Sequence, residues 1–233
     1  MYIECSDTHI SKQIGRFLNV SSMVSGDMYV YIKNCSISFF VTDHISTYCH
    51  YLILDKSYFS CFDINKCVCF VLSTSFKINK RLIKSFTIRD ECIEIGTETI
   101  YMVRSNNNML HMITDNKNMY SKQLFECEFL KCDFVSMVNS ICLHDGIINV
   151  NIKHPDLVFT SRSYYGDSKY TYTFKKNIVK INNNFDYIAK QFKSIILHSE
   201  KSVYIKFQIM SDGLVRVDYD SIVIYIAPYI CTE

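Results

Sequence analysis

The sequence predicts an α+β fold made of two similar halves, and three observations support this prediction. Of the 233 residues, 48% are hydrophobic and 14% are aromatic, all of the latter Tyr or Phe, a composition that favours β-strands. Four helical segments recur in pairs along the chain. A polar, asparagine-rich segment at 105–123 separates the two halves and is typical of a linker.

The first half begins with a short strand and an amphipathic helix. A strand is expected at 2–5, and apolar residues recur at helical spacing over 8–20. A second helix is expected at 66–76, in the segment KCVCFVLSTSF. The remaining runs of alternating or β-branched residues predict strands at 28–34, 36–43, 47–54, 81–90, 91–98 and 99–105.

The second half repeats this order with little residue identity. Helices are expected at 132–144 and 185–197, which begin 124 and 119 residues after the helices that begin at 8 and 66. Strands are expected at 125–129, 146–153, 156–163, 169–174, 177–182, 202–210, 213–220 and 222–230. We therefore expect an internal duplication, with modules at 1–107 and 124–233 and a connector at 108–123.

The composition argues against several classes of enzyme. The six glycines never lie within ten residues of each other, so the chain has neither a P-loop nor a dinucleotide-binding fingerprint. The eleven cysteines form no Cys-x-x-Cys pair of the kind that binds zinc. We expect no enzymatic activity, no metal and no cofactor. The net charge of +2 means that any binding of nucleic acid must come from the local placement of Lys and Arg.

The location expected from the sequence is intracellular. The odd number of cysteines in a chain of this length favours free thiols in a reducing compartment. The opening residues MYIECSDTHISK lack the basic and apolar regions of a signal peptide, and no stretch reaches the roughly 18 apolar residues that span a membrane.

The C-terminal strand ends in a proline, which cannot donate a hydrogen bond to a β-ladder. The segment reads SIVIYIAPYICTE, and its Tyr225-Ile226-Ala227-Pro228 resembles the ending of the sliding-clamp family of eukaryotes and archaea, proliferating cell nuclear antigen and its relatives. Tyr229 stands where that family has a basic residue. The preceding meander, from Ser202 onward, is also similar to the last strands of the family in length and alternation.

The resemblance implies a DNA clamp fold and a corresponding function. Subunits of this family join edge to edge into a ring, usually of three, with helices lining the hole and sheets outside. We expect edges near 109–115 and 169–174 to join, which would protect exposed strands from other pairings. The implied function is a processivity factor that encircles duplex DNA in the nucleus. Its partners would be a clamp loader, DNA polymerase and other replication and repair proteins.

The resemblance also implies two sets of site residues. A hydrophobic groove that receives short docking motifs would be built from Phe40, His44, Ile45, Met112, Ile113, Ala227, Pro228 and Ile230. Contacts to DNA phosphates would come from Lys12, Arg16, Lys77, Lys80, His144, Lys190 and Lys193. Lys153 falls near a lysine that is modified in the family. The third helix departs from the family, because Ser136 and Asn139 stand where arginines are usual.

The residues alone leave other interpretations open. Without the resemblance, Ile45 and Ile113 would be taken as core residues, and the lysine pairs as solvated helix faces. The absence of the usual arginines from the third helix favours one subunit of a heterotrimeric DNA-damage checkpoint clamp, in which charge can be distributed unevenly over the ring. A clamp-like scaffold that never encircles DNA is a third hypothesis.

Overall fold

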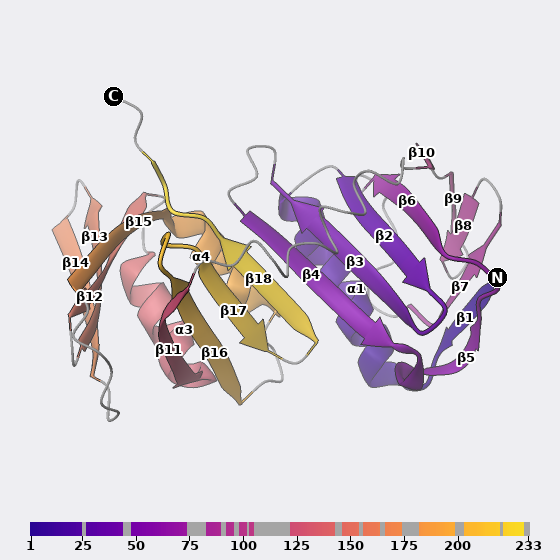
Figure 1. Ribbon diagram of the computed structural model, residues 1–233, viewed down its shortest axis with the longest axis horizontal. Helices are drawn as coiled ribbons and strands as arrows, with labels where there is room; N and C mark the ends of the chain where they lie inside the picture. Colours follow the sequence, from indigo (N-terminus) through magenta and orange to yellow (C-terminus); the bar gives the residue numbers. More distant parts are fainter. Residues whose placement is uncertain are drawn as a thin grey trace. The chain divides into compact units, whose positions relative to one another are not determined.

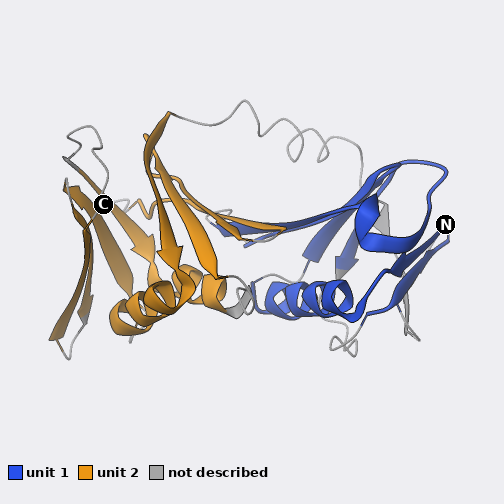
Figure 2. Cartoon of the chain, turned by 90° about the horizontal axis from the view of Figure 1, so that it is seen from below, with its two compact units in different colours: residues 1–119 blue, residues 120–233 orange. Residues whose placement is uncertain are grey.

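A computed structural model of the chain shows a sheet-rich α+β protein that divides into two compact units, Met1–Met119 and Tyr120–Glu233 (Figures 1 and 2). The structure describes residues 1–24, 27–43, 48–73, 83–89, 92–95, 98–101, 103–104, 122–142, 146–153, 156–163, 166–173, 182–198, 203–219 and 221–230. No helix in these ranges is long and apolar enough to cross a membrane.

The first unit contains one α-helix and ten strands among its described residues. The strands form two antiparallel groups, in the orders β5-β1-β7-β8-β9 and β10-β6-β2-β3-β4. The elements are β1 (Tyr2–Cys5), α1 (Thr8–Val24), β2 (Asp27–Lys33), β3 (Ser36–Thr42), β4 (Tyr48–Asp55), the 3₁₀ turn η1 (Lys56–Tyr58), β5 (Phe59–Asp63), β6 (Val68–Ser73), β7 (Ser85–Ile88), β8 (Cys92–Ile95), β9 (Glu98–Tyr101) and β10 (Val103–Arg104).

The second unit contains two helices and eight strands among its described residues. The strands again form two antiparallel groups, in the orders β11-β16-β17-β18 and β15-β12-β13-β14. The elements are β11 (Gln123–Leu130), α3 (Lys131–Ile141), β12 (Ile147–Lys153), β13 (Asp156–Ser163), β14 (Gly166–Thr173), β15 (Asn182–Ile188), α4 (Ala189–His198), β16 (Tyr204–Met210), β17 (Val215–Tyr219) and β18 (Ile222–Ile226).

The two units repeat one strand order. The strand before the first helix of each unit pairs with the first strand of a three-stranded meander, β1 with β7 of β7-β8-β9 and β11 with β16 of β16-β17-β18. The hairpins β2–β3 and β12–β13 also share one register, because Lys33 pairs with Ser36 and Lys153 pairs with Asp156. Adding 120 to a residue number in the first hairpin therefore gives its counterpart in the second.

The same shift of 120 residues aligns the first helices of the two units. The buried residues of α3 are Phe134, Met137, Val138 and Ile141, and their counterparts in α1 are also buried: Ile14, Phe17, Leu18 and Ser21. Each helix thus packs the same stripe of positions against its own sheets, which is the amphipathic arrangement expected of a surface helix.

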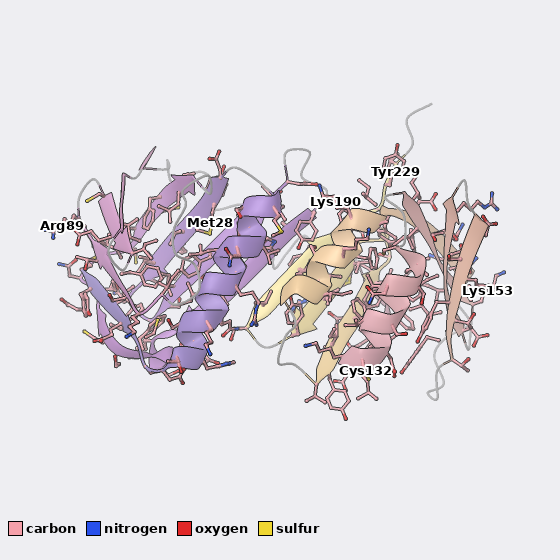
Figure 3. The ribbon with its side chains drawn as sticks, turned by 180° about the vertical axis from the view of Figure 1, so that it is seen from behind. Met28, Arg89, Cys132, Lys153, Lys190 and Tyr229 are labelled. Atoms are coloured by element: carbon pink, nitrogen blue, oxygen red, sulfur yellow. The ribbon has the colours of Figure 1, made fainter. Side chains whose placement is uncertain are left out.

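Aromatic side chains pack among aliphatic ones in the core of each unit. In the first unit, Phe17 of α1 lies 6.0 Å from Phe39 of β3, measured between ring centroids. In the second unit, where α3 and α4 lie side by side (Figure 3), the fully buried ring of Phe207 has four Phe neighbours within 6.5 Å. These clusters explain why the sequence is so rich in Phe.

Two of the expected helices are corrected by the structure. The helix expected at 66–76 is wrong over 68–73, which form the strand β6 between β2 and β10. The helix expected at 185–197 begins only at Ala189, because 185–188 belong to β15 and pair with β12. The 3₁₀ turn and strand at 56–63 were not expected. The connector lies outside the described residues, apart from Lys122 and Gln123, the latter being the first residue of β11.

Candidate functional site

The first helix presents a basic stripe to solvent. The Oδ1 atom of Asp7 accepts the backbone N–H of Ile10 at 2.9 Å, which stabilises the start of α1. Ile14 and Phe17 face the core with no exposed surface, so the opposite side of α1 is its outer face. Lys12 is exposed and Arg16 is half-buried on this outer face, so the expected i, i+4 pair does share one side of the helix.

The second unit presents one basic helix face and one without basic residues. On α4, Lys190 is exposed (Figure 3 labels it). Lys193 is half-buried, while Phe192 between them is fully buried. On α3, the exposed positions include Ser136 and Asn139. The hydroxyl and amide groups of this face carry no charge, as the sequence predicted.

Positive charge is concentrated on the helices. The three described helices contain five Lys or Arg residues and one Asp, a net charge of +4. The whole chain has 25 basic and 23 acidic residues, so the rest of the chain has 20 and 22 and a net charge of −2. A surface of this kind attracts anions at the helix faces without making the whole protein basic.

An aromatic row crosses the outer face of the first unit's sheet. Phe40 of β3 lies on the face opposite Phe39, and its ring centroid is 4.7 Å from that of Tyr51 on β4 and 5.9 Å from that of Tyr29 on β2. Phe40 is half-buried, and Tyr51 is 7% exposed. Sequence reasoning identified Phe40 but missed Tyr29 and Tyr51. The signal available was that all three alternate with the core residues of their own strands.

The proline-containing tail leaves the sheet as the sequence predicted, although the strand expected at 222–230 ends earlier, at Ile226. Strand β18 ends at Ile226, and Ala227 and Pro228 are half-buried outside it. The backbone N–H of Tyr229 donates to the carbonyl oxygen of Asp186 at 2.6 Å, which holds the tail against β15. Ile230 follows with 77% of its surface exposed (Figure 3 shows Tyr229 at this end of the unit).

The remaining predicted site residues divide into two groups. Lys153 is exposed at the end of β12, on a strand rather than on a helix (Figure 3). The others lie outside the described residues: Lys77, Lys80 and His144 of the DNA set, and His44, Ile45, Met112 and Ile113 of the groove set.

The described titratable groups include no cluster suited to metal binding. Within the described ranges, no three His, Cys, Asp or Glu side chains gather as possible ligands, and the ten described cysteines are free thiols. Burial raises the pKa of the Cys5 thiol to about 12, with smaller contributions from Asp7 and Glu4. Burial likewise raises the pKa of Cys127. These two thiols are therefore protonated at neutral pH and are poor nucleophiles.

Comparison with known families finds no relative. No family model matches the chain, and no curated protein matches it significantly.

Proposed function

We propose that this chain is a subunit of a ring-shaped sliding clamp that encircles duplex DNA and tethers replication and repair proteins to it. The observation that carries the proposal is the placement of charge. The described helices have a net charge of +4 and the rest of the chain −2, in a fold whose two units repeat one strand order. The C-terminal Tyr225-Ile226-Ala227-Pro228 adds the family resemblance.

The helix faces suit contact with a phosphate backbone. Lys12 and Arg16 on α1, and Lys190 and Lys193 on α4, are carried by regular helices. Charges on rigid elements of this kind attract phosphates without reading base edges, so the binding would be independent of sequence and weakened by salt. A protein that slides along DNA requires both properties.

The strand edges suit the closure of a ring. β14 is the last strand of its sheet, and alternate residues from Lys169 to Thr173 are exposed. Among the described strands, β9 is likewise the last one of the group β5-β1-β7-β8-β9 in the first unit. Joining β14 of one copy to β9 of the next would satisfy the backbone groups of both edges and close a cycle of identical subunits, which we propose to be a trimer. The edge near 169–174 was expected, whereas 109–115 lies outside the described residues.

The aromatic row and the tail suit partner docking. Phe40 with Tyr29 and Tyr51 forms a partly exposed aromatic surface, and Ile230 is an exposed apolar side chain. Such side chains are the usual energetic centre of peptide recognition. The proposed partners are DNA polymerase, other replication and repair proteins, and a clamp loader that opens the ring.

One observation favours a second candidate function. The outer face of α3 presents Ser136 and Asn139 rather than basic residues. A subunit of a heterotrimeric checkpoint clamp, or a clamp-like scaffold that does not encircle DNA, would tolerate this uneven distribution of charge.

Two measurements in series test these alternatives. Light scattering across a concentration series is expected to give the mass of three subunits, or about 82 kDa from the chain mass of 27.3 kDa. Loading onto nicked circular DNA, with retention after a salt wash and release on linearisation, would then demonstrate encirclement. A persistent monomer would contradict the homotrimer. A trimer that is released from circular and linear DNA alike would favour the scaffold.

A further inference from the structure

A buried polar network joins the first helix to the sheet beneath it. His50 of β4 has no exposed surface, and its ring lies edge-on to Phe17 of α1, with 4.6 Å between the centroids. Its Nε2 atom is 3.0 Å from Oγ of Ser21, also on α1, and its Nδ1 atom is 3.2 Å from the hydroxyl of Tyr48. Ser21 and Tyr48 are themselves buried, so the whole network is removed from solvent.

The hydrogen bonds of Ser21 determine the form of the imidazole ring. The Ser21 hydroxyl donates its proton to the carbonyl oxygen of Phe17, at 2.7 Å. Since a hydroxyl has only one proton, its bond with His50 must be one in which Nε2–H donates to Ser21. A neutral ring with a proton on Nε2 has an acceptor at Nδ1, and the Tyr48 hydroxyl then donates to it. The network is therefore complete with a neutral His50.

The second unit shows that this fold does not require the network. Under the shift of 120 residues, the counterpart of Ser21 is Ile141, which is buried and aliphatic. Phe40 pairs with Tyr51 and Thr160 pairs with Lys169, so the counterpart of His50 is Ser168. The second unit thus attaches its helix without a histidine. A buried polar group that the fold can omit adds little stability on average, and specificity or switching is its best-attested use.

We propose that His50 is a proton-sensitive latch: its neutral form holds the C-terminal half of α1 on the sheet, and uptake of a proton releases that half. Protonation would place a positive charge on a ring with no exposed surface, and it would put N–H groups at both ring nitrogens, so that the Tyr48 hydroxyl could no longer donate to Nδ1. Release of the helix gives the cation access to water. This inference does not depend on the proposed function.

Among the described residues, ionisable groups lie on the elements that form the latch. Tyr48 faces the ring from β4, and the Oδ1 atom of Asp43 accepts the backbone N–H of Tyr48 at 3.1 Å. The α1 sequence has no acidic residue, and its other ionisable residues, His9, Lys12 and Arg16, precede Ser21 by more than one helical turn. The β3 sequence, SISFFVT, has no ionisable side chain.

Hydrogen exchange on the full chain tests the latch. Amide protection factors, which remove the intrinsic pH dependence of exchange, would be compared at pH 7.5 and pH 5.5. We expect the protection of the α1 amides from Phe17 to Ser21 to fall about tenfold, because a released histidine takes up its proton near pH 6.5. The equivalent amides of α3, Met137 to Ile141, should keep theirs. Absence of the fall in α1, or an equal fall in α3, would overturn the proposal.

Two variants assign the effect to one side chain. His50→Gln keeps an N–H near the position of Nε2 but cannot take up a proton in this range, so the fall in α1 protection should disappear. The control is His9→Gln, which removes an exposed histidine from the same helix and should leave the fall unchanged. A fall that persists in His50→Gln would contradict the latch.

A measurement on the unmodified chain covers the case in which His50→Gln does not fold. The ¹⁵N chemical shifts of the ring nitrogens distinguish the two neutral tautomers and the cation. The proton is expected on Nε2 at pH 7.5. A proton on Nδ1, or a cationic ring at that pH, would overturn the proposal.

Discussion

The two units place different side chains on equivalent outer surfaces. In the first unit, a row across the sheet reads Tyr29, Phe40, Tyr51, and the equivalent row of the second unit reads Asn149, Thr160, Lys169. The Asn149 side chain donates to the carboxylate of Asp186 at 2.7 Å, a polar contact on the neighbouring strand. The same backbone thus supports an aromatic surface in one unit and a polar surface in the other.

The first helices differ in the same way. Lys12 and Arg16 of α1 have Cys132 and Ser136 of α3 as counterparts, all of them outside the buried stripe (Figure 3 labels Cys132). The four positions of the shared buried stripe, by contrast, are apolar in both helices apart from Ser21. The two units have the same fold although their outer residues differ. Folding therefore does not constrain these outer residues, and they are available for binding.

The largest expected effect is on the free energy of unfolding, through the buried Phe residues that both units have in their cores. Phe207→Ala should lower the free energy of unfolding by about 3–5 kcal/mol, because the ring is fully buried against four other Phe rings. Phe39→Ala is the matched change in the first unit, where the ring contacts Phe17 and Phe86. Urea unfolding measures both, and a loss below about 1 kcal/mol for either variant would contradict the assigned core.

The next effect tests the difference between the two outer rows. Phe40→Ala should weaken binding of a peptide with aliphatic and aromatic anchors on one helical turn by about tenfold or more, since it removes the central ring of the row. Thr160→Ala is the control at the equivalent position of the second unit and should leave the affinity unchanged. Fluorescence anisotropy with a labelled peptide measures both. Equal losses in the two variants would show that the aromatic row is not the docking surface.

The helix faces give a smaller effect that can be tested in both directions. Changing Lys12 and Arg16 together to Ser should reduce the slope of log affinity against log salt concentration for duplex DNA by about two, because two phosphate contacts are lost. The reciprocal change, Ser136→Arg, should increase the slope by about one. Filter binding at several salt concentrations measures these slopes. An unchanged slope in the double variant would remove α1 from the DNA surface.

The smallest effect is a pH dependence in the second unit. Burial alone would raise the pKa of Glu126, but hydrogen bonds from Gln208 and Lys206 outweigh it and hold the pKa below its ordinary value of 4.5. Such a carboxylate stabilises the fold above that value, and the contribution is lost as the pH falls below it. Because the side chain is 39% exposed, solvent screening keeps the effect small. Unfolding of Glu126→Gln should show a shallower loss of stability between pH 5 and pH 3 than the wild type, and parallel curves would contradict this contribution.

Local patterns predicted most of the fold, and the failures have identifiable physical causes. The helices expected at 8–20 and 132–144 are present as Thr8–Val24 and Lys131–Ile141, because their apolar positions recur at one period over several turns. Val68–Ser73 was misassigned because a short apolar run fits a helix or a strand equally well, and pairing with β2 on one side decides for the strand.

The candidate site was less accessible to sequence reasoning than the fold. Lys12 and Arg16 could be paired because helical spacing places them on one face. Tyr29, Phe40 and Tyr51 lie on three strands, so their row exists only once the registers of β2, β3 and β4 are fixed. Registers are set by turns and burial together, and a pattern within one strand does not contain them.

The shared hairpin register also bears on the ancestry of the chain. Of the sixteen positions 27–42, four are identical to their counterparts 120 residues later, and three of these are the fully buried or nearly buried pairs Val30/Val150, Ile32/Ile152 and Phe39/Phe159. The fourth is Lys33/Lys153, beside the turn. After a gene duplication, packing restrains sequence change at inward-facing positions, whereas outward-facing positions in contact with solvent are free to change. The observed pattern of identities is the one that such a duplication produces. Lys153, which lies near the lysine that is modified in the resembling family, therefore has an equivalent residue in the first unit, Lys33. Its presence is equally consistent with inheritance from a half-length ancestor.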